Sequence, residues 1–273
     1  MNLTKTDDGR PGPYGRAMDG KGKNTMADKE PRRRRRWPLL VLLVLLVLGA
    51  AGAAVWYFLI REDAPERANI DDASQTLDSV ATGDPVAAED LVGDWTVDTS
   101  VGSFDDFSGT WAGYRFDEEL ASIGATTAVG RTPDVSGTMT VTEDEVTGVD
   151  VEVDMTTLQS DQSFRDEAIR TRGLQTNDFP TGTFELAEPL EIPDGLTDGA
   201  QVQAKATGNL TIHGVTQEIT VDLEAQIVGE QAVVVGSAPV ALTDFDIDPP
   251  TGASVLAVSN EGEFEFQVFF SKA

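Results

Sequence analysis

Apolar and polar residues alternate with a period of two through most of residues 93–273, a pattern typical of strands with one buried face. The sharpest case is the run GNLTIHGVTQEITV over 208–221, which alternates on both sides of His213-Gly214. We predict a β-hairpin there, with its turn at these two residues. Further strands are predicted at 110–116, 126–130, 137–142, 149–155, 183–186, 201–206, 232–242 and 263–270. Each sharply patterned strand has one apolar and one charged face, which favours an antiparallel sandwich or a closed barrel and does not choose between them.

One helix is predicted among these strands. Residues 161–172 read DQSFRDEAIRTR and end at Gly173, a residue type that commonly caps helices. Phe164 and Ile169 share one face of this helix. A further short turn of helix is expected near 117–122.

The longest apolar run has 22 residues without a charge, beginning at Leu39 and ending at Ile60. At about 1.5 Å per residue, a helix of this length reaches about 33 Å, enough to cross a hydrocarbon core of about 30 Å. We therefore predict a transmembrane helix over 37–60. Eight basic residues lie in 21–36 against two in 61–80, which places the N-terminus in the cytoplasm and the C-terminal domain outside it. The alternative, a signal peptide cleaved near the small residues of the run, is disfavoured because apolar residues continue beyond them.

Charge is distributed unevenly along the chain, whose formal net charge is -27. Residues 1–36 carry 11 basic and 5 acidic side chains, so a disordered basic cytoplasmic tail is expected. Residues 61–92 are rich in Ala, Asp and Glu and are interpreted as an acidic flexible tether. Residues 93–273 hold 7 basic against 33 acidic side chains, a balance that disfavours nucleic-acid binding. The chain has no Cys, which excludes disulfides, thiolate metal sites and Cys nucleophiles.

Several short motifs, taken in order, resemble the YceI-like family of lipocalin-shaped, polyisoprenoid-binding proteins. L-T-I-H-G-V-T over 210–216 follows N-D-F-P over 177–180 and precedes T-D-F-D-I over 243–247. A-G-Y-R-F over 112–116 and A-V-G-R-T over 128–132 resemble the form of the family found in actinobacteria. The resemblance implies an all-β fold, an antiparallel eight-stranded lipocalin-like barrel with a short helix near its mouth, here preceded by one transmembrane helix.

The resemblance also implies a ligand in the barrel interior, a long isoprenoid or similar amphipathic lipid such as a quinone or polyprenyl carrier. From the residues alone two interpretations stay open, because the apolar strand faces either pack into a solid core or line a tunnel. In the tunnel interpretation the candidate ligand-lining residues are Val149, Val151, Val153, Met155, Ala204, Ala206, Leu210, Ile212, Ile219, Val221, Leu223, Phe264, Phe266 and Val268. Burying one five-carbon isoprene unit contributes up to roughly 4 kcal/mol before binding costs.

Polar candidates are few. Arg165, Arg170 and Arg172 lie on the predicted helix and are candidates to meet a polar lipid head group or a diphosphate. The alternative is that these arginines, with Arg115 and Arg131, pair with nearby carboxylates, an interaction that contributes little stability where it is exposed.

His213 is the only His of the chain, and a lone His supplies neither a catalytic triad nor a metal site. We interpret it as a turn residue that faces solvent or a neighbouring strand. No catalytic residue and no cofactor are predicted.

Asp244, Asp246 and Asp248 have the spacing that opens a calcium loop. Pro249 occupies the position that the loop requires to be Gly, and Val255 the position of its final Glu. The favoured interpretation is a strand end with its carboxylates in water and no metal.

The sequence thus predicts a single-pass membrane protein whose extracytoplasmic barrel sequesters or transfers a lipid without covalent chemistry. The first alternative is a surface-displayed structural or interaction domain with a solid core. The second is an enzyme that acts on a lipid-linked substrate through a carboxylate pair. The lipid binder predicts an apolar space inside the barrel, the solid module predicts large side chains meeting at its centre, and the enzyme predicts an inward carboxylate with a raised pKa.

Overall fold

Helix α1 (Trp37–Ile60) forms where the sequence predicts a transmembrane helix. The computed structural model describes residues 37–60, 64–80, 91–122, 124–193 and 197–273, and it describes the side chains of α1 from 41 to 52. The expected disordered tail, 1–36, lies outside the described residues. Within the part of the chain that the structure describes, no helix has the length and apolar character needed to cross a membrane. The membrane span therefore stays a prediction.

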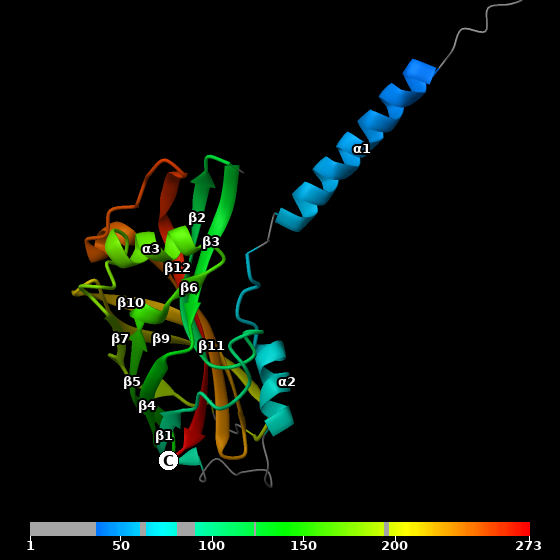
Figure 1. The fold of residues 1–273 in the computed structure, drawn as a ribbon. Coiled ribbons are helices and arrows are strands. Elements are labelled where there is room, and N and C mark those ends of the chain that lie inside the picture. The colour runs from blue at the N-terminus through cyan, green and yellow to red at the C-terminus, as the bar shows by residue number, and fades with distance from the viewer. Residues whose placement is uncertain (1–36, 61–63, 81–90, 123, 194–196) are drawn as a thin grey trace, which may run out of the picture. The chain divides into compact units, whose positions relative to one another are not determined.

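The second of two compact units, residues 61–273, is built on one antiparallel sheet that closes on itself (Figure 1). Eight strands form the ring, in the order β1 (Gly93–Val97), β4 (Val135–Val141), β5 (Glu145–Asp154), β7 (Thr181–Leu186), β9 (Gln201–Ile212), β10 (Val215–Val228), β11 (Gln231–Ala241) and β12 (Val255–Lys272). The ring closes because β1 pairs with β4 on one side and with β12 on the other. The structure confirms the predicted antiparallel barrel and excludes the sandwich.

Strand β12 is 18 residues long and pairs with two strands along one edge. Its last residues pair with β1, and its first part pairs with β2 (Trp111–Leu120). Beyond β2 lie β3 (Gly124–Thr132) and β6 (Gln159–Ser160), while β8 (Leu190–Glu191) pairs with β5. Because β11 occupies the other edge of β12, β1 and β2 follow each other along the same wall. The barrel therefore extends well beyond the five residues of β1.

The hairpin expected around His213-Gly214 is present. Ile212 pairs with Val215, and His213 and Gly214 have φ angles of 55° and 74°, the left-handed pair that a tight two-residue hairpin requires. The short helical turn expected near 117–122 is wrong, because β2 continues as a strand to its last residue, Leu120.

Helix α3 (Ser163–Thr171) confirms the helix expected over 161–172. It lies between β6 and β7 in the chain and at the end of the barrel opposite to β1 and the C-terminus (Figure 1). Two short 3-10 helices, η2 (Met155–Thr157) and η3 (Leu242–Phe245), follow β5 and β11.

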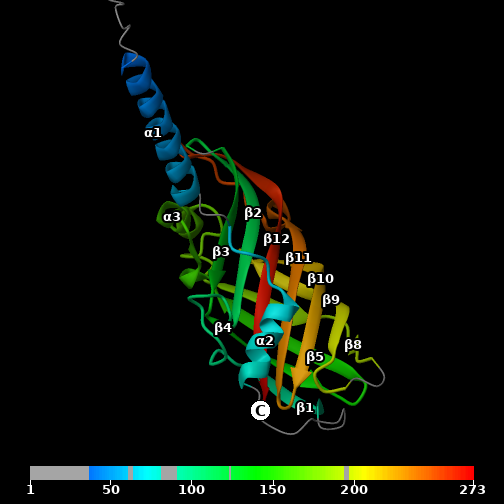
Figure 2. The same cartoon turned by 90° about the vertical axis from the view of Figure 1, so that its right-hand side faces the viewer.

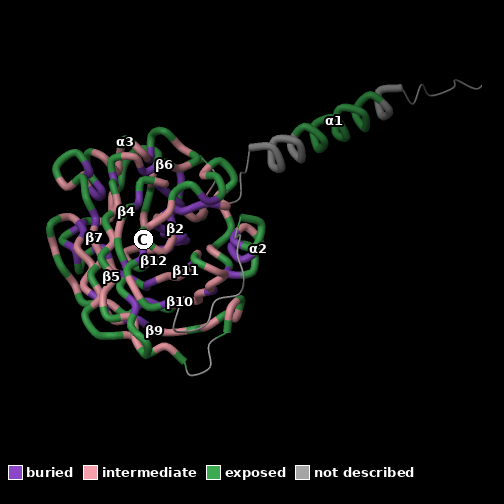
Figure 3. Tube along the Cα trace, turned by 90° about the horizontal axis from the view of Figure 1, so that it is seen from below, coloured by how far each residue is buried: buried purple, intermediate pink, exposed green. Residues whose placement is uncertain are grey.

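Helix α2 (Ile70–Val80) corrects the expectation of a flexible tether over 61–92. Ile70, Ala73 and Leu77 have the spacing of one helical face and are buried. That face packs against apolar residues on the outer surface of the barrel, namely Val233 and Val235 of β11 and Phe269 of β12. In Figures 2 and 3, α2 lies on the outside of the barrel. A helix of 11 residues is marginal in water, so this packing explains why it forms. Residues 81–90 of the expected tether lie outside the described residues.

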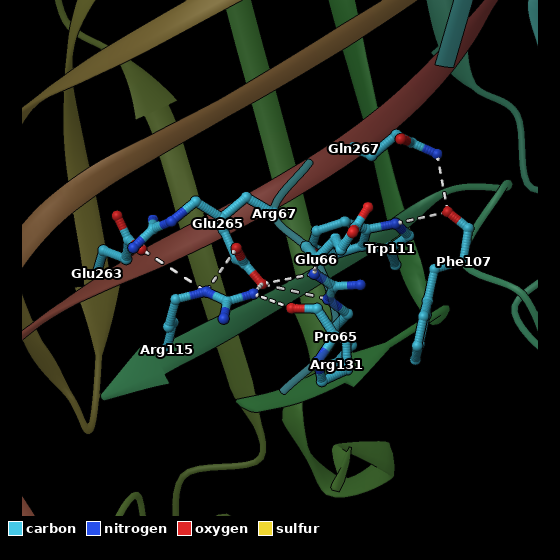
Figure 4. Close-up of polar contacts among 10 residues, drawn as sticks. All are labelled: Pro65, Glu66, Arg67, Phe107, Trp111, Arg115, Arg131, Glu263, Glu265 and Gln267. Atoms are coloured by element: carbon cyan, nitrogen blue, oxygen red, sulfur yellow. Dashed lines mark hydrogen bonds and ion pairs between the residues drawn. The ribbon is translucent and has the colours of Figure 1, made fainter. Parts of the chain in front are cut away.

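Buried ion pairs hold the segment before α2 against the barrel (Figure 4). Glu265 of β12 forms ion pairs with Arg131 of β3, at 2.8 Å, and with Arg115 of β2, at 3.3 Å. The same guanidinium groups donate to the backbone carbonyls of Pro65 and Glu66. The pairing expected of Arg115 and Arg131 is confirmed, and it is buried, since the three side chains are 1% to 10% exposed.

The loop between β1 and β2 covers this cluster from another side (Figure 4). The Arg131 guanidinium lies 3.8 Å from the ring centroid of Trp111 and 4.6 Å from that of Phe107. Gln267 of β12 donates to the carbonyl of Phe107 at 3.2 Å and to the next two carbonyls of the loop. The outer face of β2, β3 and β12 is therefore a second packed region, outside the barrel interior.

Candidate functional site

A cavity of about 310 Å³ occupies the barrel interior. Aliphatic and aromatic side chains dominate its wall, which β1 and β4 complete with Trp95, Val135 and Met139. All fourteen residues proposed from the sequence as ligand-lining lie on this wall: Val149, Val151, Val153, Met155, Ala204, Ala206, Leu210, Ile212, Ile219, Val221, Leu223, Phe264, Phe266 and Val268. Their contact with a ligand stays a prediction.

Four aromatic rings of the interior lie against the barrel wall, each over a glycine of a neighbouring strand. The pairs are Tyr114 with Gly130, Phe116 with Gly262, Phe184 with Gly208, and Phe266 with Gly236. A β-carbon on Gly236 would lie 2.7 Å from Cζ of Phe266, closer than real contacts allow. Rings that cover strand glycines in this way are a known device of curved sheets. Because the rings take up the space next to the backbone, the centre of the barrel keeps its open volume.

The T-D-F-D-I motif closes the barrel at the end near α3. Pairing between β10 and β11 stops at Asp222 and Ser237, and η3 contacts both strands beyond that point. Gln217 of β10 donates to the Asp244 carbonyl at 2.7 Å. Phe245, 2% exposed, joins the hydrophobic cluster at this end of the interior.

His213 is a turn residue, as expected, but its ring is packed. Its Nδ1 lies 3.1 Å from the Phe245 carbonyl, and its ring centroid lies 4.4 Å from that of Phe179. His213 therefore links the β9–β10 hairpin to the segment that contains Phe245. This one contact joins two of the motifs noted in the sequence, L-T-I-H-G-V-T and T-D-F-D-I.

The side chains of Asp244, Asp246 and Asp248 are exposed, as the interpretation without metal expects. They belong to a 3-10 turn and the residues after it instead of a strand end. Among the described residues, no group of three or more His, Asp or Glu side chains is placed to hold a metal ion.

A second cavity of about 240 Å³ lies beneath α3, between that helix, β2 and the segment 250–255. Tyr114, Leu174 and Phe264 line both cavities. The two spaces are therefore neighbours separated by a few shared side chains.

Arg165 of α3 enters this second cavity and forms a buried ion pair with Glu118 of β2. Its Nη2 lies 2.5 Å from Oε1 of Glu118, the two side chains are 8% and 2% exposed, and Nη1 pairs with Asp161. Burial alone would lower the pKa of Arg165, but the hydrogen bonds and charges of Glu118 and Asp161 raise it overall. Of the other head-group candidates, Arg172 lines the cavity at an exposed position, whereas Arg170 pairs with Glu167 at 3.0 Å and does not line it.

Two residues of this site were not among the candidates from the sequence. Tyr114 is buried with its hydroxyl inside the protein, and burial raises its pKa despite the opposing charge of Arg165. Glu118 faces the interior on the same strand face as Tyr114 and Phe116. The sequence held a signal for Glu118, because a carboxylate follows two aromatic residues at alternate positions. It was missed because the strand was expected to end at residue 116.

The family model of the YceI-like domain matches residues 91–270. A UPF0312 protein of Vibrio parahaemolyticus is 30% identical over 187 residues, which cover 64% of this chain and 87% of that protein. A UPF0312 protein of Pseudomonas aeruginosa is 29% identical over 178 residues, 55% of this chain and 86% of that protein.

Among solved structures, a polyisoprenoid-binding domain from Saccharophagus degradans matches with a TM-score of 0.49 and 15% identity, over 66% of this chain and 98% of that domain. The BcnA protein of Burkholderia cenocepacia matches with a TM-score of 0.44 and 16% identity, over 58% of this chain and 95% of that protein.

Proposed function

Since this chain belongs to the YceI-like family, we propose that its barrel binds the apolar chain of an isoprenoid lipid, a quinone or a polyprenyl compound, and sequesters or transfers it. The observation that carries the proposal is the cavity of about 310 Å³ inside the barrel. Protein pockets that hold small molecules have volumes of about 300–1,000 Å³. Apolar walls favour a hydrocarbon chain because burial removes its surface from water, and such binding needs no covalent chemistry.

The same cavity separates this proposal from its alternatives. A structural module with a solid core requires large side chains at the centre of the barrel, whereas four aromatic rings of the interior lie over glycines of the wall. An enzyme of the kind considered requires a pair of carboxylates. Glu118, whose carboxylate lines the cavity beneath α3, instead forms an ion pair with Arg165.

The cell location is part of the proposal. We place the barrel outside the cytoplasm, held to the cell membrane through α1. The support is the 22-residue run without a charge and the eight basic residues in 21–36, a charge distribution that orients single spans with the basic side in the cytoplasm. Extraction of membranes with alkaline carbonate tests the anchor, and release of the full-length protein into the soluble fraction would contradict it.

Native mass spectrometry of the full-length protein, followed by organic extraction, tests lipid binding. We expect an isoprenoid lipid to co-purify in stoichiometric amount, or an added polyprenol or quinone to bind one per chain. Protein that is empty and takes up neither compound would overturn the proposal and favour the surface-displayed module.

A further inference from the structure

The second cavity contains two hydrogen-bond donors that have no acceptor among the described residues. Oη of Tyr114 and Nε of Arg165 are both buried and both lack a partner there. Tyr114 is 6% exposed and Arg165 is 7% exposed, so bulk water does not reach either group freely. Buried donors in native proteins nearly always meet an acceptor. Two unpaired donors from side chains that line one cavity therefore require an acceptor from outside the described residues, either a buried water or an oxygen of a ligand.

The position of Tyr114 links this cavity to the interior of the barrel. Tyr114 lines both spaces, whereas Arg165 lines only the one beneath α3. A lipid whose tail occupies the apolar cavity and whose head passes Tyr114 brings that head next to Arg165. Burial keeps the Tyr114 hydroxyl protonated and able to donate.

The charges around Arg165 decide which head group fits. Its guanidinium already pairs with Glu118 and Asp161, so this group of three side chains has a net charge of −1. A phosphate or diphosphate in the cavity would lie near the carboxylate of Glu118, which is 2% exposed, and like charges in a poorly hydrated space repel strongly. Arg172, the other basic residue of the wall, is exposed. A neutral oxygen avoids this repulsion.

We propose that the cavity beneath α3 binds a neutral, carbonyl-bearing head group of the quinone type, whose oxygen accepts hydrogen bonds from Tyr114 Oη and Arg165 Nε. The inference rests on the proposed function, because the tail in the barrel cavity is what brings the head to this place. It replaces the diphosphate considered for Arg165 from the sequence.

Three probes with the same tail of four isoprene units test the inference: a benzoquinone, a hydrocarbon without a head group, and a diphosphate. Their affinities for the full-length protein are measured by displacement of one fluorescent lipid. We expect the quinone to bind most tightly and the diphosphate most weakly. Tyr114→Phe removes only the hydroxyl and should lower the affinity for the quinone about five- to tenfold, the effect of one lost hydrogen bond, without changing that of the hydrocarbon.

Two further variants complete the test. Leu223 lines the barrel cavity and not the second one, so Leu223→Ala should weaken all three probes by the same factor. A β-carbon on Gly130 would lie 2.5 Å from Tyr114 Oη, so Gly130→Ala should displace the hydroxyl and reproduce the selective loss of quinone binding, which keeps the test decisive if Tyr114→Phe folds poorly.

Tight binding of the diphosphate, or an equal loss of quinone and hydrocarbon affinity in Tyr114→Phe, would overturn the head-group inference while lipid binding by the barrel stands. Absence of binding by all three probes would instead overturn the proposed function, and the head-group inference with it.

Discussion

Arg131 and Glu265 form a buried ion pair on the outside of the barrel, with Nη2 2.8 Å from Oε1 and side-chain exposures of 3% and 1%. Burial lowers the pKa of Arg131, and the charge of Glu265 opposes that shift. Arg115 reaches the same carboxylate at 3.3 Å and Glu263 at 3.8 Å, so Glu265 is the acidic side chain that contacts both guanidinium groups. The cluster joins β2, β3 and β12 beneath the segment that leads into α2.

Glu265→Gln should therefore be strongly destabilising. It leaves the buried guanidinium of Arg131 without its carboxylate and Arg115 with only the longer contact to Glu263 at 3.8 Å. Removal of one partner from a buried pair costs about 3–5 kcal/mol. The free energy of unfolding from urea titrations measures the effect. Glu167→Gln is the matched control. Glu167 and Arg170 form an ion pair whose side chains are 63% and 37% exposed, and such a pair should contribute less than about 1 kcal/mol. Equal losses of unfolding free energy in the two variants would show that the buried cluster contributes no more to stability than an exposed ion pair.

Leu77→Ala tests whether α2 is part of the folded barrel unit. Leu77 is fully buried between α2 and the outer surface, and truncation of a buried leucine costs about 2–5 kcal/mol. Val80→Ala, on the same helix but 38% exposed, should cost well under half as much. We also expect proteases to cleave near α2 faster in Leu77→Ala than in the control variant. Unchanged stability and cleavage in Leu77→Ala would contradict the packing.

Most strands were predictable because one face of each is buried and the other is in water, which preserves the alternation. Helix α2 was not, because its composition resembles a tether and its partners, Val233 and Val235, lie on the outward face of β11. Only the closed barrel shows that these outward valines need a cover. Strand β1 was missed because it has only five residues, too few to establish a period.

The lining of the candidate site was predictable from strand parity, but the open space inside it was not. That space depends on rings such as Phe266 that lie over a glycine of the next strand, Gly236, and cross-strand placement is not a local property of the sequence. The same limit hid the pair of Arg165 with Glu118, which are 47 positions apart. Local spacing identified the arginines of α3 but not which of them is buried.

Ala206→Phe tests the role of the barrel cavity. Ala206 is 5% exposed and lines the cavity, so a ring at this position should occupy the space proposed for the lipid tail. We expect lipid binding to fall at least tenfold, with a smaller stability cost than the roughly 1–3 kcal/mol of overpacking a filled core. Lys205→Phe places the same ring on the exposed side of β9 and should retain binding. Full lipid affinity in Ala206→Phe would contradict the assignment of the cavity as the binding site.

Asp98 gives a prediction for the pH dependence of stability at the point where the barrel closes. Its carboxylate accepts hydrogen bonds from the backbone and hydroxyl of Ser100 and from the hydroxyl of Ser271 on β12. Burial alone would raise the pKa of Asp98, but these hydrogen bonds lower it below its ordinary value of 3.8. A depressed folded pKa means that the folded state favours the charged form, so its stabilising contribution is complete above pH 3.8 and is lost as the pH falls through the lower folded value.

Asp98→Asn should remove this contribution. The difference in unfolding free energy between the wild type and Asp98→Asn should be constant from neutral pH down to about pH 5 and should shrink below pH 4, since protonation then removes the same charge from the wild type. Urea titrations at a series of pH values measure the difference, and Asp150→Asn, an exposed carboxylate on β5, corrects for the general loss of one negative charge. A difference that grows on acidification would show that the hydrogen bonds of Ser100 and Ser271 do not favour the charged carboxylate.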